Sequence, residues 1–308
     1  MNDPDISVIV VSYNTRDLLR DCLASVEATM GGLSYEVIVV DNASADGSAA
    51  MVAAMFPRAR LIVNDVNRGF AAANNQAFAV MRGLYALLLN SDAVLTPRAA
   101  LILFDFMENH PEAAMACGQL LNADGTKQNS IAAFPSLLTL TLNMPLLEYL
   151  FPRRFPSKRY EHEGPVEVDS GIGACLMVRR SAMDRVGWFD EDYFFFFEET
   201  DWAYRMRRAG YKVYHVPQAR IYHLQGQSVG HRLPSRIAFY KARYHYFRKW
   251  HGPLYYLAVR VVVFCRLLVD FLLTLGGVVA TLGLARNLRR RLSLYGSLLL
   301  WHCGLLRP

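Results

Sequence analysis

LLLNSDAVL, at residues 87–95, is the stretch that decides the fold class of this chain. Its leucines end an apolar run short enough to be a buried strand, and Asn90, Ser91 and Asp92 then open a loop. In open α/β sheets, ligands bind outside the carboxyl ends of the strands, where an acidic residue can hold a divalent cation beside a diphosphate. We therefore predict that Asp92 binds a metal ion. The alternative is that Asp92 caps the next helix.

The same pattern occurs before this stretch, in apolar runs that are rich in β-branched residues. The predicted strands are residues 6–12, 35–40, 60–63 and 84–89, and helical patterns follow the first three at 18–26, 48–56 and 71–82. Strands that alternate with helices at this period form a parallel sheet with helices on both faces. We predict an α/β fold with a mainly parallel sheet, which is a common setting for nucleotide binding.

Polar residues follow each predicted strand and should converge on one crevice, because parallel strands end on the same side of the sheet. They are Ser12, Asn14, Asp41, Asn64, Asn67 and Asp92. Asp41 could accept a hydrogen bond from a ribose hydroxyl or a base N–H, or it could cap the following helix. Arg68 and the backbone amides beside Gly69 could face a phosphate.

Two common nucleotide-binding motifs are absent. No GxGxxG follows the first strand, and no GxxxxGK[ST] occurs anywhere in the chain. These absences disfavour Rossmann dehydrogenases and P-loop NTPases. Binding of a nucleotide sugar requires neither motif and remains open.

A second informative block covers residues 166–211. VEVDSGIGACLMVRR, at 166–180, predicts a strand interrupted by Gly171 and Gly173, where a substrate could approach the backbone. WFDEDYFFFFEETDWAYRMRRAGY, at 188–211, brings carboxylates beside many aromatic side chains. Carboxylates next to apolar surface are candidates for a raised pKa and for general-base catalysis. The candidates here are Glu198, Glu199 and Asp201, which could instead only favour a helix N-terminus.

The whole-chain composition suggests a cytoplasmic protein. The five cysteines are far apart and include no CxxC pair, so we expect neither a zinc site nor a disulfide framework. The first residues, MNDPDISVIVVSYN, have no basic segment and too short an apolar run for a secretory signal, so we expect no export.

The carboxyl-terminal region has a different character. Residues 233–250 mix arginines with tyrosine, phenylalanine and tryptophan, which suits the headgroup layer of a membrane. Over a trial span of 261–281, Arg266 and Asp270 nearly offset the apolar residues, although the two lie four positions apart and can pair. The basic segment RNLRRR follows at 286–291.

The formal net charge is +6, and basic residues are clustered in this late segment, between apolar segments. This pattern favours a membrane surface with anionic lipid and disfavours nucleic acid as a partner. The alternative is a soluble helical tail through which two copies form a homodimer.

Seven stretches together resemble the family-two inverting glycosyltransferases of the GT-A fold, especially the rhamnosyltransferase-like branch that builds bacterial surface polysaccharides. They are VIVVSYN, VVDNASADGS, NRGFAAANN, LLLNSDAVL, SGIGACLMVRR, GWFDEDYFFFFEETDWAYRMRRAGY and YHLQGQS, and they extend over about residues 6–230. The resemblance implies a GT-A domain at 1–232, and the composition of the remainder predicts a membrane-associating helical region at 233–308.

The resemblance also implies which residues bind the donor. A nucleotide-sugar site would be formed by Ser12, Asn14, Asp41, Asn67, Arg68, Gly69, Asn74, Ser91 and Asp92. Asp92 and His223 would hold Mg²⁺ or Mn²⁺, while Gly173, Arg205 and His223 would lie near the acceptor or the diphosphate. Asn90-Ser91-Asp92 has one carboxylate where the family's acidic motif has two, so metal dependence is left open.

For the catalytic base, the family pattern is Glu-Asp-x-Asp, and this chain has Glu198-Glu199-Thr200-Asp201. We predict Glu199 as the base, with Asp201 second and Glu198 third. The resemblance implies a single in-line displacement with inversion. The QxxRW signature of processive synthases is absent, which favours transfer of one sugar at a time.

The first candidate donor is dTDP-rhamnose, with UDP-hexoses and other nucleotide sugars as alternatives. The resemblance also points to a lipid-linked or saccharide acceptor and to the cytoplasmic face of the plasma membrane. A catalytically silent nucleotide-sugar-binding scaffold of the same fold is the alternative, favoured only by the Glu at position 199. A nucleotidyltransferase is disfavoured, because its Gly/Arg/Lys-rich loop is missing after the first strand.

Overall fold

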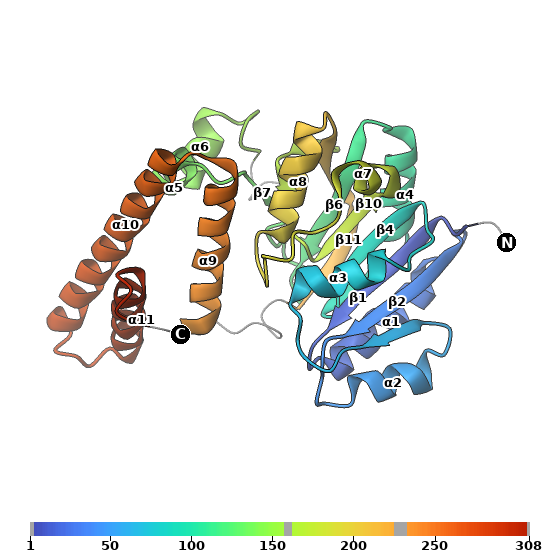
Figure 1. The fold of residues 1–308 in the computed structure, drawn as a ribbon, viewed down its shortest axis with the longest axis horizontal. Coiled ribbons are helices and arrows are strands. Elements are labelled where there is room, and N and C mark those ends of the chain that lie inside the picture. Colours follow the sequence, from blue (N-terminus) through green and yellow to red (C-terminus); the bar gives the residue numbers. More distant parts are fainter. Residues whose placement is uncertain (1–2, 157–161, 225–232, 307–308) are drawn as a thin grey trace. The chain divides into compact units, whose positions relative to one another are not determined.

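The computed structural model describes residues 3–156, 162–224 and 233–306, which belong to two compact units (Figure 1). The first unit comprises Met1–Phe134 and Glu148–Val229, and the second comprises Pro135–Leu147 and Gly230–Pro308. The second unit thus takes in residues 135–147, which the predicted division assigns to the GT-A domain. The predicted boundary after residue 232 falls at the end of a segment outside the described residues and stays a prediction.

The first unit is an α/β structure. Its strands are β1 (Ile6–Ser12), β2 (Tyr35–Asp41), β3 (Arg60–Val63), β4 (Tyr85–Asn90), β5 (Ala93–Leu95), β6 (Ala113–Leu121), β7 (Ile131–Ala132), β8 (Val166–Val168), β9 (Ser170–Gly171), β10 (Cys175–Arg179) and β11 (Lys212–His223). Its helices are α1 (Arg16–Thr29), α2 (Ser48–Met55), α3 (Phe70–Phe78), α4 (Ala99–Asn109), α7 (Arg180–Val186) and α8 (Glu198–Arg208). A short helix, α6 (Met144–Leu150), continues from the second unit into the first.

Within the described residues, nine strands form one sheet in the order β3-β2-β1-β4-β10-β6-β11-β5, with β8 paired to β11. The β1–β2, β1–β4 and β2–β3 pairings are parallel, as predicted. β10 runs antiparallel between β4 and β6, and β11 pairs antiparallel with β5 and β8. The α/β prediction is confirmed, but the sheet is mixed beyond β4. The chain reaches β10 through a long excursion after β6 rather than a helical crossover, and no local sequence pattern sets the direction of such a strand.

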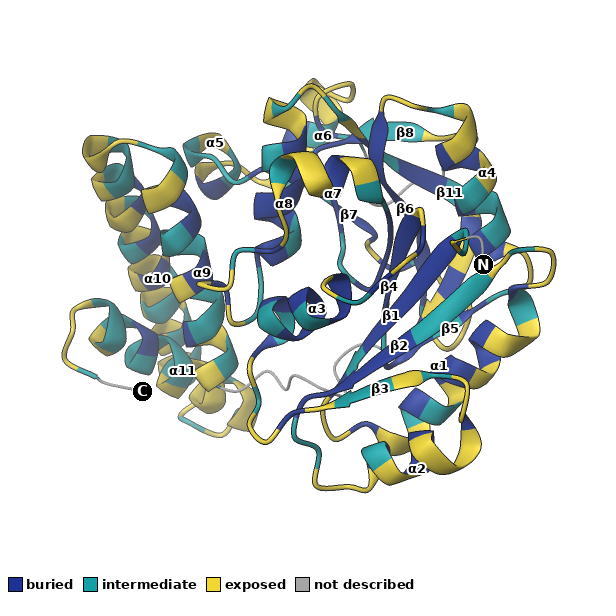
Figure 2. Cartoon of the chain, turned by 45° about the vertical axis from the view of Figure 1, so that its right-hand side comes forward, coloured by how far each residue is buried: buried dark blue, intermediate teal, exposed yellow. Residues whose placement is uncertain are grey.

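Helices cover both faces of this sheet (Figure 2), because alternate residues of each buried strand point to opposite sides. Val8, Val10 and Leu87 pack with α1 and α4 on one face. Ile9 and Leu88 pack with α3, α7 and α8 on the other, where Trp202 is completely buried. The two layers fix the carboxyl ends of β1, β2 and β4, from which the candidate site extends.

One predicted helix is shorter than expected. The pattern over 71–82 predicts a full helix, whereas α3 ends at Phe78. The chain must turn after α3, because Gly83 passes so close to β1 that a Cβ atom there would lie 2.4 Å from the backbone nitrogen of Ser7.

The second unit is helical and contains α5 (Leu137–Thr141), α9 (Leu233–Trp250), α10 (Pro253–Ala280) and α11 (Arg286–His302). The hydroxyl of Tyr255 in α10 accepts a hydrogen bond from the backbone of Leu137 at 2.9 Å. Arg266 donates to the carbonyl oxygen of Leu140 at 2.9 Å. This is a correction to the predicted pairing of Arg266 with Asp270, for which no ion pair is present among the described residues.

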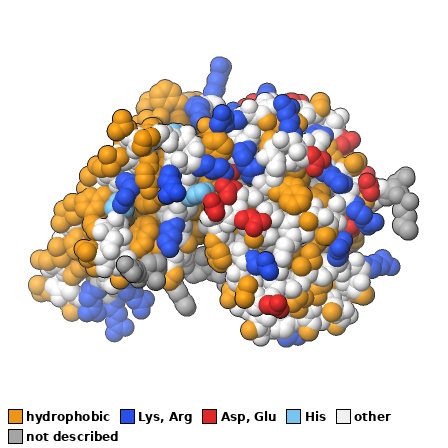
Figure 3. Space-filling model, viewed as in Figure 1, with side chains coloured by type: hydrophobic (Ala, Val, Ile, Leu, Met, Phe, Trp, Pro, Cys, Tyr) orange, Lys and Arg blue, Asp and Glu red, His pale blue; other side chains and the backbone are white. Residues whose placement is uncertain are grey.

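α10 is long and apolar enough to cross a membrane, with a mean hydropathy of 2.1 in its most apolar window. Hydrophobic side chains are widely exposed over the second unit in Figure 3, and on α10 they include Leu254, Leu273 and Val279. Only 17% of the window is buried, which is unlike the core helix of a soluble bundle.

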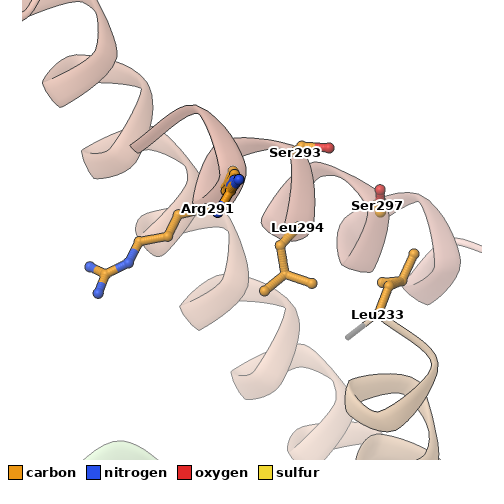
Figure 4. A pocket seen from close by; sticks show the side chains of 6 residues that line it. Leu233, Arg291, Ser293, Leu294 and Ser297 are labelled. Atoms are coloured by element: carbon orange, nitrogen blue, oxygen red, sulfur yellow. The ribbon is translucent and has the colours of Figure 1, made fainter. Parts of the chain in front are cut away.

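A hollow of about 330 Å³ also lies in this unit, between the start of α9 and α11 (Figure 4). It is lined by Leu233, Arg290, Arg291, Ser293, Leu294 and Ser297. Arg291 points away from Leu294 and Leu233 in Figure 4, so the lining does not form a convergent set of donors.

Candidate active site

Asp92 and His223 lie together at the carboxyl end of the sheet. β4 ends at Asn90, and β5 follows Asp92 directly and pairs with β11, so that Ala93 lies opposite His223. Asp92 Oδ1 is 3.4 Å from His223 Nε2, and both side chains are buried. The capping alternative for Asp92 is wrong, because α4 begins only at Ala99, with Arg98 at its cap position.

This pair fits a divalent cation. A carboxylate oxygen and an imidazole nitrogen are common donors to Mn²⁺, and carboxylates also suit Mg²⁺. Two ligands that share one such ion at roughly 2.1 Å are roughly 3 Å apart, which is close to the separation of Asp92 and His223. The donor set therefore agrees with the metal role implied by the family resemblance.

Asp41 ends β2 and is 1% exposed. Its Oδ2 accepts a hydrogen bond from the backbone of Ser44 at 3.0 Å, whereas its Oδ1 is buried and has no hydrogen-bond partner. Asp41 is not the cap of α2, because Gly47 occupies that position. A buried carboxylate oxygen without a donor is costly unless a ligand supplies one.

Asn14 lies beside Asp41 through the loop that follows β2. Its side-chain oxygen accepts a hydrogen bond from the backbone of Ala45 at 2.8 Å, and its own backbone donates to Ser44 Oγ at 2.9 Å. Asn14 and Ala43 both have positive φ, at 54° and 68°. The two strand-end loops are therefore locked together in unusual backbone conformations.

A chain of hydroxyl groups joins this region to Asp92. Ser12 Oγ lies 3.0 Å from Thr15 Oγ1, which donates to Ser91 Oγ at 2.8 Å. All three residues are buried. Ser12 and Ser91 are thus brought together, as predicted for one crevice, by a residue that the sequence analysis did not identify, Thr15.

The loop before α3 is organised by Asn42, which was also missed. Its amide donates to Asn67 Oδ1 at 2.9 Å, and its oxygen accepts from the backbone of Arg68 at 3.0 Å. The Arg68 side chain is exposed. Asn74 is buried and donates to the carbonyl oxygen of Phe70 at 2.9 Å, so its amide nitrogen bonds within α3.

Gly69 brings this loop against the aromatic segment that precedes α8. Its φ is +85°, and a Cβ atom at this position would lie 2.5 Å from the carbonyl oxygen of Phe194. That carbonyl accepts a hydrogen bond from the backbone of Phe70 at 2.8 Å. The requirement for glycine here is both conformational and steric.

The three candidate bases are in the first turn of α8. Phe196 and Phe197, which precede them, have positive φ of 74° and 71°. Such backbone strain in bulky residues often accompanies functional sites. The acidic first turn also agrees with the simpler alternative, stabilisation of a helix N-terminus.

Glu198 and Glu199 differ from Asp201 in their surroundings. Glu198 is 5% exposed, its Oε2 has no hydrogen-bond partner, and burial, together with the charge of Glu199, raises its pKa well above the usual range. Glu199 is half-buried, and desolvation raises its pKa to about 7 against the opposing effect of hydrogen bonds from its own backbone and from Thr200. A Cβ atom on Gly173 would lie 3.9 Å from Glu199 Cγ, so these two predicted residues are neighbours.

Asp201 is fully buried and paired with Arg205. Arg205 Nε donates to Asp201 Oδ2 at 2.9 Å, and its other nitrogens donate to the carbonyl oxygens of Val186, Gly187 and Trp188. Arg205 therefore orients a carboxylate, but the same contacts commit its guanidinium to the protein. Asp201 is the least available of the three candidate bases.

A short path connects the base region to the Asp92–His223 pair. Ala174, the residue after Gly173, accepts a hydrogen bond from the backbone of Asn90 at 3.0 Å. The side-chain amide of Asn90 lies 3.4 Å from His223 Nε2. Successive contacts thus connect Glu199, Gly173, Asn90, His223 and Asp92 into one continuous region. The stretch YHLQGQS continues into residues 225–228, outside the described residues.

Gln128 is a third residue that sequence reasoning missed. It is 8% exposed, and its Oε1 lies 2.7 Å from His223 Nδ1. A single buried glutamine in a loop has no motif that would have identified it. Asn42 was more accessible to prediction, because it follows Asp41 directly in VVDNASADGS.

Comparison with known proteins identifies the family of this chain. Residues 7–187 match the model of glycosyl transferase family 2. An N-acetylglucosaminyl-diphospho-decaprenol L-rhamnosyltransferase of Mycobacterium tuberculosis is 29% identical over 271 residues, which are 81% of this chain and 87% of that protein.

Two solved structures share the fold. The crystal structure of S. aureus TarS 1–349 has a TM-score of 0.50 and 16% identity, over 73% of this chain and 60% of that one. GalNAc-T7 with UDP, GalNAc and Mn²⁺ has a TM-score of 0.54 and 16% identity, over 77% and 47%. With the family match, they show that the chain belongs to glycosyl transferase family 2 and is an inverting glycosyltransferase of the GT-A fold.

Proposed function

We propose that this enzyme moves one sugar, with rhamnose as the first candidate, from a nucleotide-diphosphate donor to a hydroxyl group of a lipid-linked or saccharide acceptor. The observation that carries the proposal is the continuous region from Glu199 through Gly173 and Asn90 to the Asp92–His223 pair. It combines a poised carboxylate with donors for a cation beside a diphosphate. The name of the M. tuberculosis relative supports rhamnose as the sugar and a diphospholipid-linked acceptor.

Glu199 is the catalytic base in this proposal. It takes the proton of the acceptor hydroxyl as the oxygen attacks the anomeric carbon, and the nucleoside diphosphate leaves from the opposite face of the sugar. A base is most effective when its pKa is near the working pH, which supports Glu199 with its raised pKa. Its contact with Gly173, which has no side chain, leaves room for an acceptor.

The donor nucleotide is held by the loops after β1, β2 and β3. The unpartnered Oδ1 of Asp41 accepts a hydrogen bond from the base or the ribose, which removes the cost of its burial. Ser12, Asn14, Asn67 and Gly69 shape this part of the site, and Arg68 faces the phosphates. Mg²⁺ or Mn²⁺ bound by Asp92 and His223 would supply positive charge beside the diphosphate.

Membrane association at the cytoplasmic face of the plasma membrane is part of the proposal. It is supported by the largely exposed apolar surface of α10 and by the arginines of α11. A lipid-linked acceptor would explain why the enzyme has such a region. If the purified chain instead forms a detergent-independent homodimer and does not bind anionic vesicles, the membrane role is wrong.

The experiment is a transfer assay with the full chain in detergent. dTDP-rhamnose, UDP-glucose, UDP-galactose and GDP-mannose are screened with Mn²⁺ and a GlcNAc-diphospho-polyprenol acceptor, beside Glu199→Gln and a matched control, Glu27→Gln, on the exposed side of α1. We expect one donor to be consumed by the wild type and the control only. Donor binding without turnover, with this acceptor present, would favour the silent scaffold.

A further inference from the structure

His223 is held by Gln128 on the side of the ring that faces away from Asp92. The His223 Nδ1 atom lies 2.7 Å from Gln128 Oε1, whereas Nε2 lies 3.4 Å from Asp92 Oδ1. Both contacts are buried, since Gln128, His223 and Asp92 are each less than a tenth exposed. The two ring nitrogens therefore have distinct partners.

The orientation of the Gln128 amide follows from its other contacts. Its Nε2 donates to the backbone carbonyl oxygen of His223 at 3.1 Å and to Asn122 Oδ1 at 2.9 Å. A backbone carbonyl can only accept, so the amide nitrogen must lie on that side. Oε1 is thereby directed at the His223 ring.

This orientation selects one tautomer of the imidazole. An amide oxygen can only accept a hydrogen bond, so Nδ1 must carry a proton and donate to Gln128. Asn90 Nδ2, which can only donate, lies 3.4 Å from Nε2 and suits an Nε2 with a free lone pair. In this neutral tautomer the Nε2 lone pair and the Asp92 carboxylate face each other, an unfavourable contact that a cation between them relieves.

We propose that Gln128 is a positioning residue that keeps His223 in the Nδ1-protonated tautomer, so that Nε2 and the Asp92 carboxylate can hold a divalent cation together. The inference rests on the metal role in the proposed function. Residues that hydrogen-bond to the far nitrogen of a ligating histidine commonly change metal affinity about 10–100-fold when they are replaced.

The surrounding strands supply a matched control. The Gln128 backbone donates to the carbonyl oxygen of Leu120 at 2.8 Å, and its carbonyl accepts from Gln119 Nε2 at 2.8 Å. Gln119 is also buried and belongs to the same network, but its amide nitrogen donates to Leu120, Gln128 and Ser130 rather than to His223. Replacing Gln119 disturbs the same buried network, but the His223 ring keeps Gln128 as its hydrogen-bond partner.

The test compares Gln128→Met, which removes the acceptor at similar side-chain length, with Gln128→Glu, which keeps an oxygen there, and with Gln119→Met. Tautomers are measured by ¹⁵N NMR of the metal-free full chain in detergent, labelled at histidine. A His223→Gln variant identifies the His223 signal among the eight histidines. Mn²⁺ affinity is measured without donor by electron paramagnetic resonance of the free ion.

We expect Nδ1-protonated His223 in the wild type, in Gln128→Glu and in Gln119→Met, and loss of this signature in Gln128→Met. We also expect Gln128→Met to weaken Mn²⁺ binding about 10–100-fold and Gln119→Met to stay close to wild type. Gln128→Glu should lose less affinity than Gln128→Met, because it keeps the acceptor for Nδ1 although it loses the amide donor to the His223 carbonyl oxygen and Asn122. His223 protonated at Nε2 and not at Nδ1 in the metal-free wild type would overturn the proposal, as would equal Mn²⁺ affinity in Gln128→Met and Gln119→Met.

Failure of the proposed function gives a different pattern. If the wild type transfers sugar but binds no Mn²⁺ or Mg²⁺, Asp92 and His223 do not hold a cation. The inference that Gln128 supports cation binding is then also wrong, even if NMR finds the Nδ1-protonated tautomer. If Gln128→Met does not fold, the wild type and Gln128→Glu still decide, because both must show Nδ1 protonation and bind Mn²⁺.

Discussion

The strand-end loops and the acidic segment, residues 193–201, satisfy their buried polar atoms in different ways. In the loops, Asn42 bonds to Asn67 and Arg68, and the Asn64 amide donates to Asn42 at 3.1 Å. In the acidic segment, the Glu198 carboxylate has an unpartnered oxygen next to two strained phenylalanines. The side-chain hydrogen bonds of the loops fix the loop backbone, whereas the acidic segment keeps a carboxyl oxygen without a hydrogen-bond partner. Asp41 is the exception in the loops, and we interpret its unpartnered oxygen as the mark of a ligand.

The largest expected effect comes from the acidic segment. Glu199→Gln removes the proposed base and should lower kcat by about 10²–10⁴-fold with little change in donor affinity. Glu199→Asp restores the residue type of the family pattern and should keep part of the activity. Steady-state transfer rates measure both. If Asp201→Asn is silent while Glu199→Gln retains near-normal kcat, the base has been assigned to the wrong residue.

Asp41→Asn tests the unsatisfied carboxylate oxygen in the strand-end loops. The neutral amide is a weaker acceptor for a base or ribose donor, so we expect about a 10–100-fold loss in affinity for the nucleoside diphosphate, as for a charged hydrogen bond. Isothermal titration calorimetry measures it. Asp65→Asn, in the exposed part of the loop after β3, is the control. Equal affinities for the two variants would mean that Asp41 does not contact the nucleotide.

Gly69→Ala tests the contact between the two regions. An added Cβ would meet the Phe194 carbonyl at 2.5 Å in a backbone with φ of +85°. We expect the free energy of unfolding to fall by about 1–3 kcal/mol, together with weaker donor binding. Gly31→Ala is the control, since nothing lies within 4 Å of a Cβ there. Matching urea midpoints for the two variants would show that the contact is not tight.

The smallest effect concerns Glu198 and the pH dependence of stability. Because its pKa is raised on folding, the folded chain binds more protons than the unfolded chain above about pH 4.5, so stability falls as the pH rises through this range. Glu198→Gln removes this contribution and should raise the Tm relative to wild type more at pH 8 than at pH 5. Each kcal/mol corresponds to about 2–4 °C. Scanning calorimetry at both pH values checks the sign, and an equal difference at both would contradict the burial argument.

Much of the fold could be predicted, because each of the first four strands is an apolar run with polar residues at its end. β1 and β3 have the predicted bounds, β2 extends one residue further, and β4 is shifted by one residue. The direction of β10 could not be predicted, since it depends on where a long excursion re-enters the sheet. The membership of residues 135–147 in the second unit depends on distant contacts such as Leu137 with Tyr255.

The candidate site also has residues that could be predicted from the sequence and residues that could not. Asp41 and Asp92 could be identified from their positions after buried strands. The proximity of His223 to Asp92 follows from the pairing of β5 with β11, which no spacing in the sequence indicates. Thr15, Asn42 and Gln128 act through other polar residues, and such buried networks leave no periodic pattern. The ranking of Glu199 above Asp201 comes from the family pattern, and the structure adds the Arg205 contact of Asp201 and the raised pKa of Glu199.

The central claim is that burial keeps Glu199 poised as a base, and the pH dependence of kcat/KM tests it most directly. Only the ionised carboxylate accepts a proton, and burial raises the pKa of Glu199 to about 7. We predict that kcat/KM rises about tenfold per pH unit below pH 6 and levels off above pH 8, because the ionised fraction of the carboxylate limits the rate. A flat profile between pH 5.5 and 8 would contradict the account.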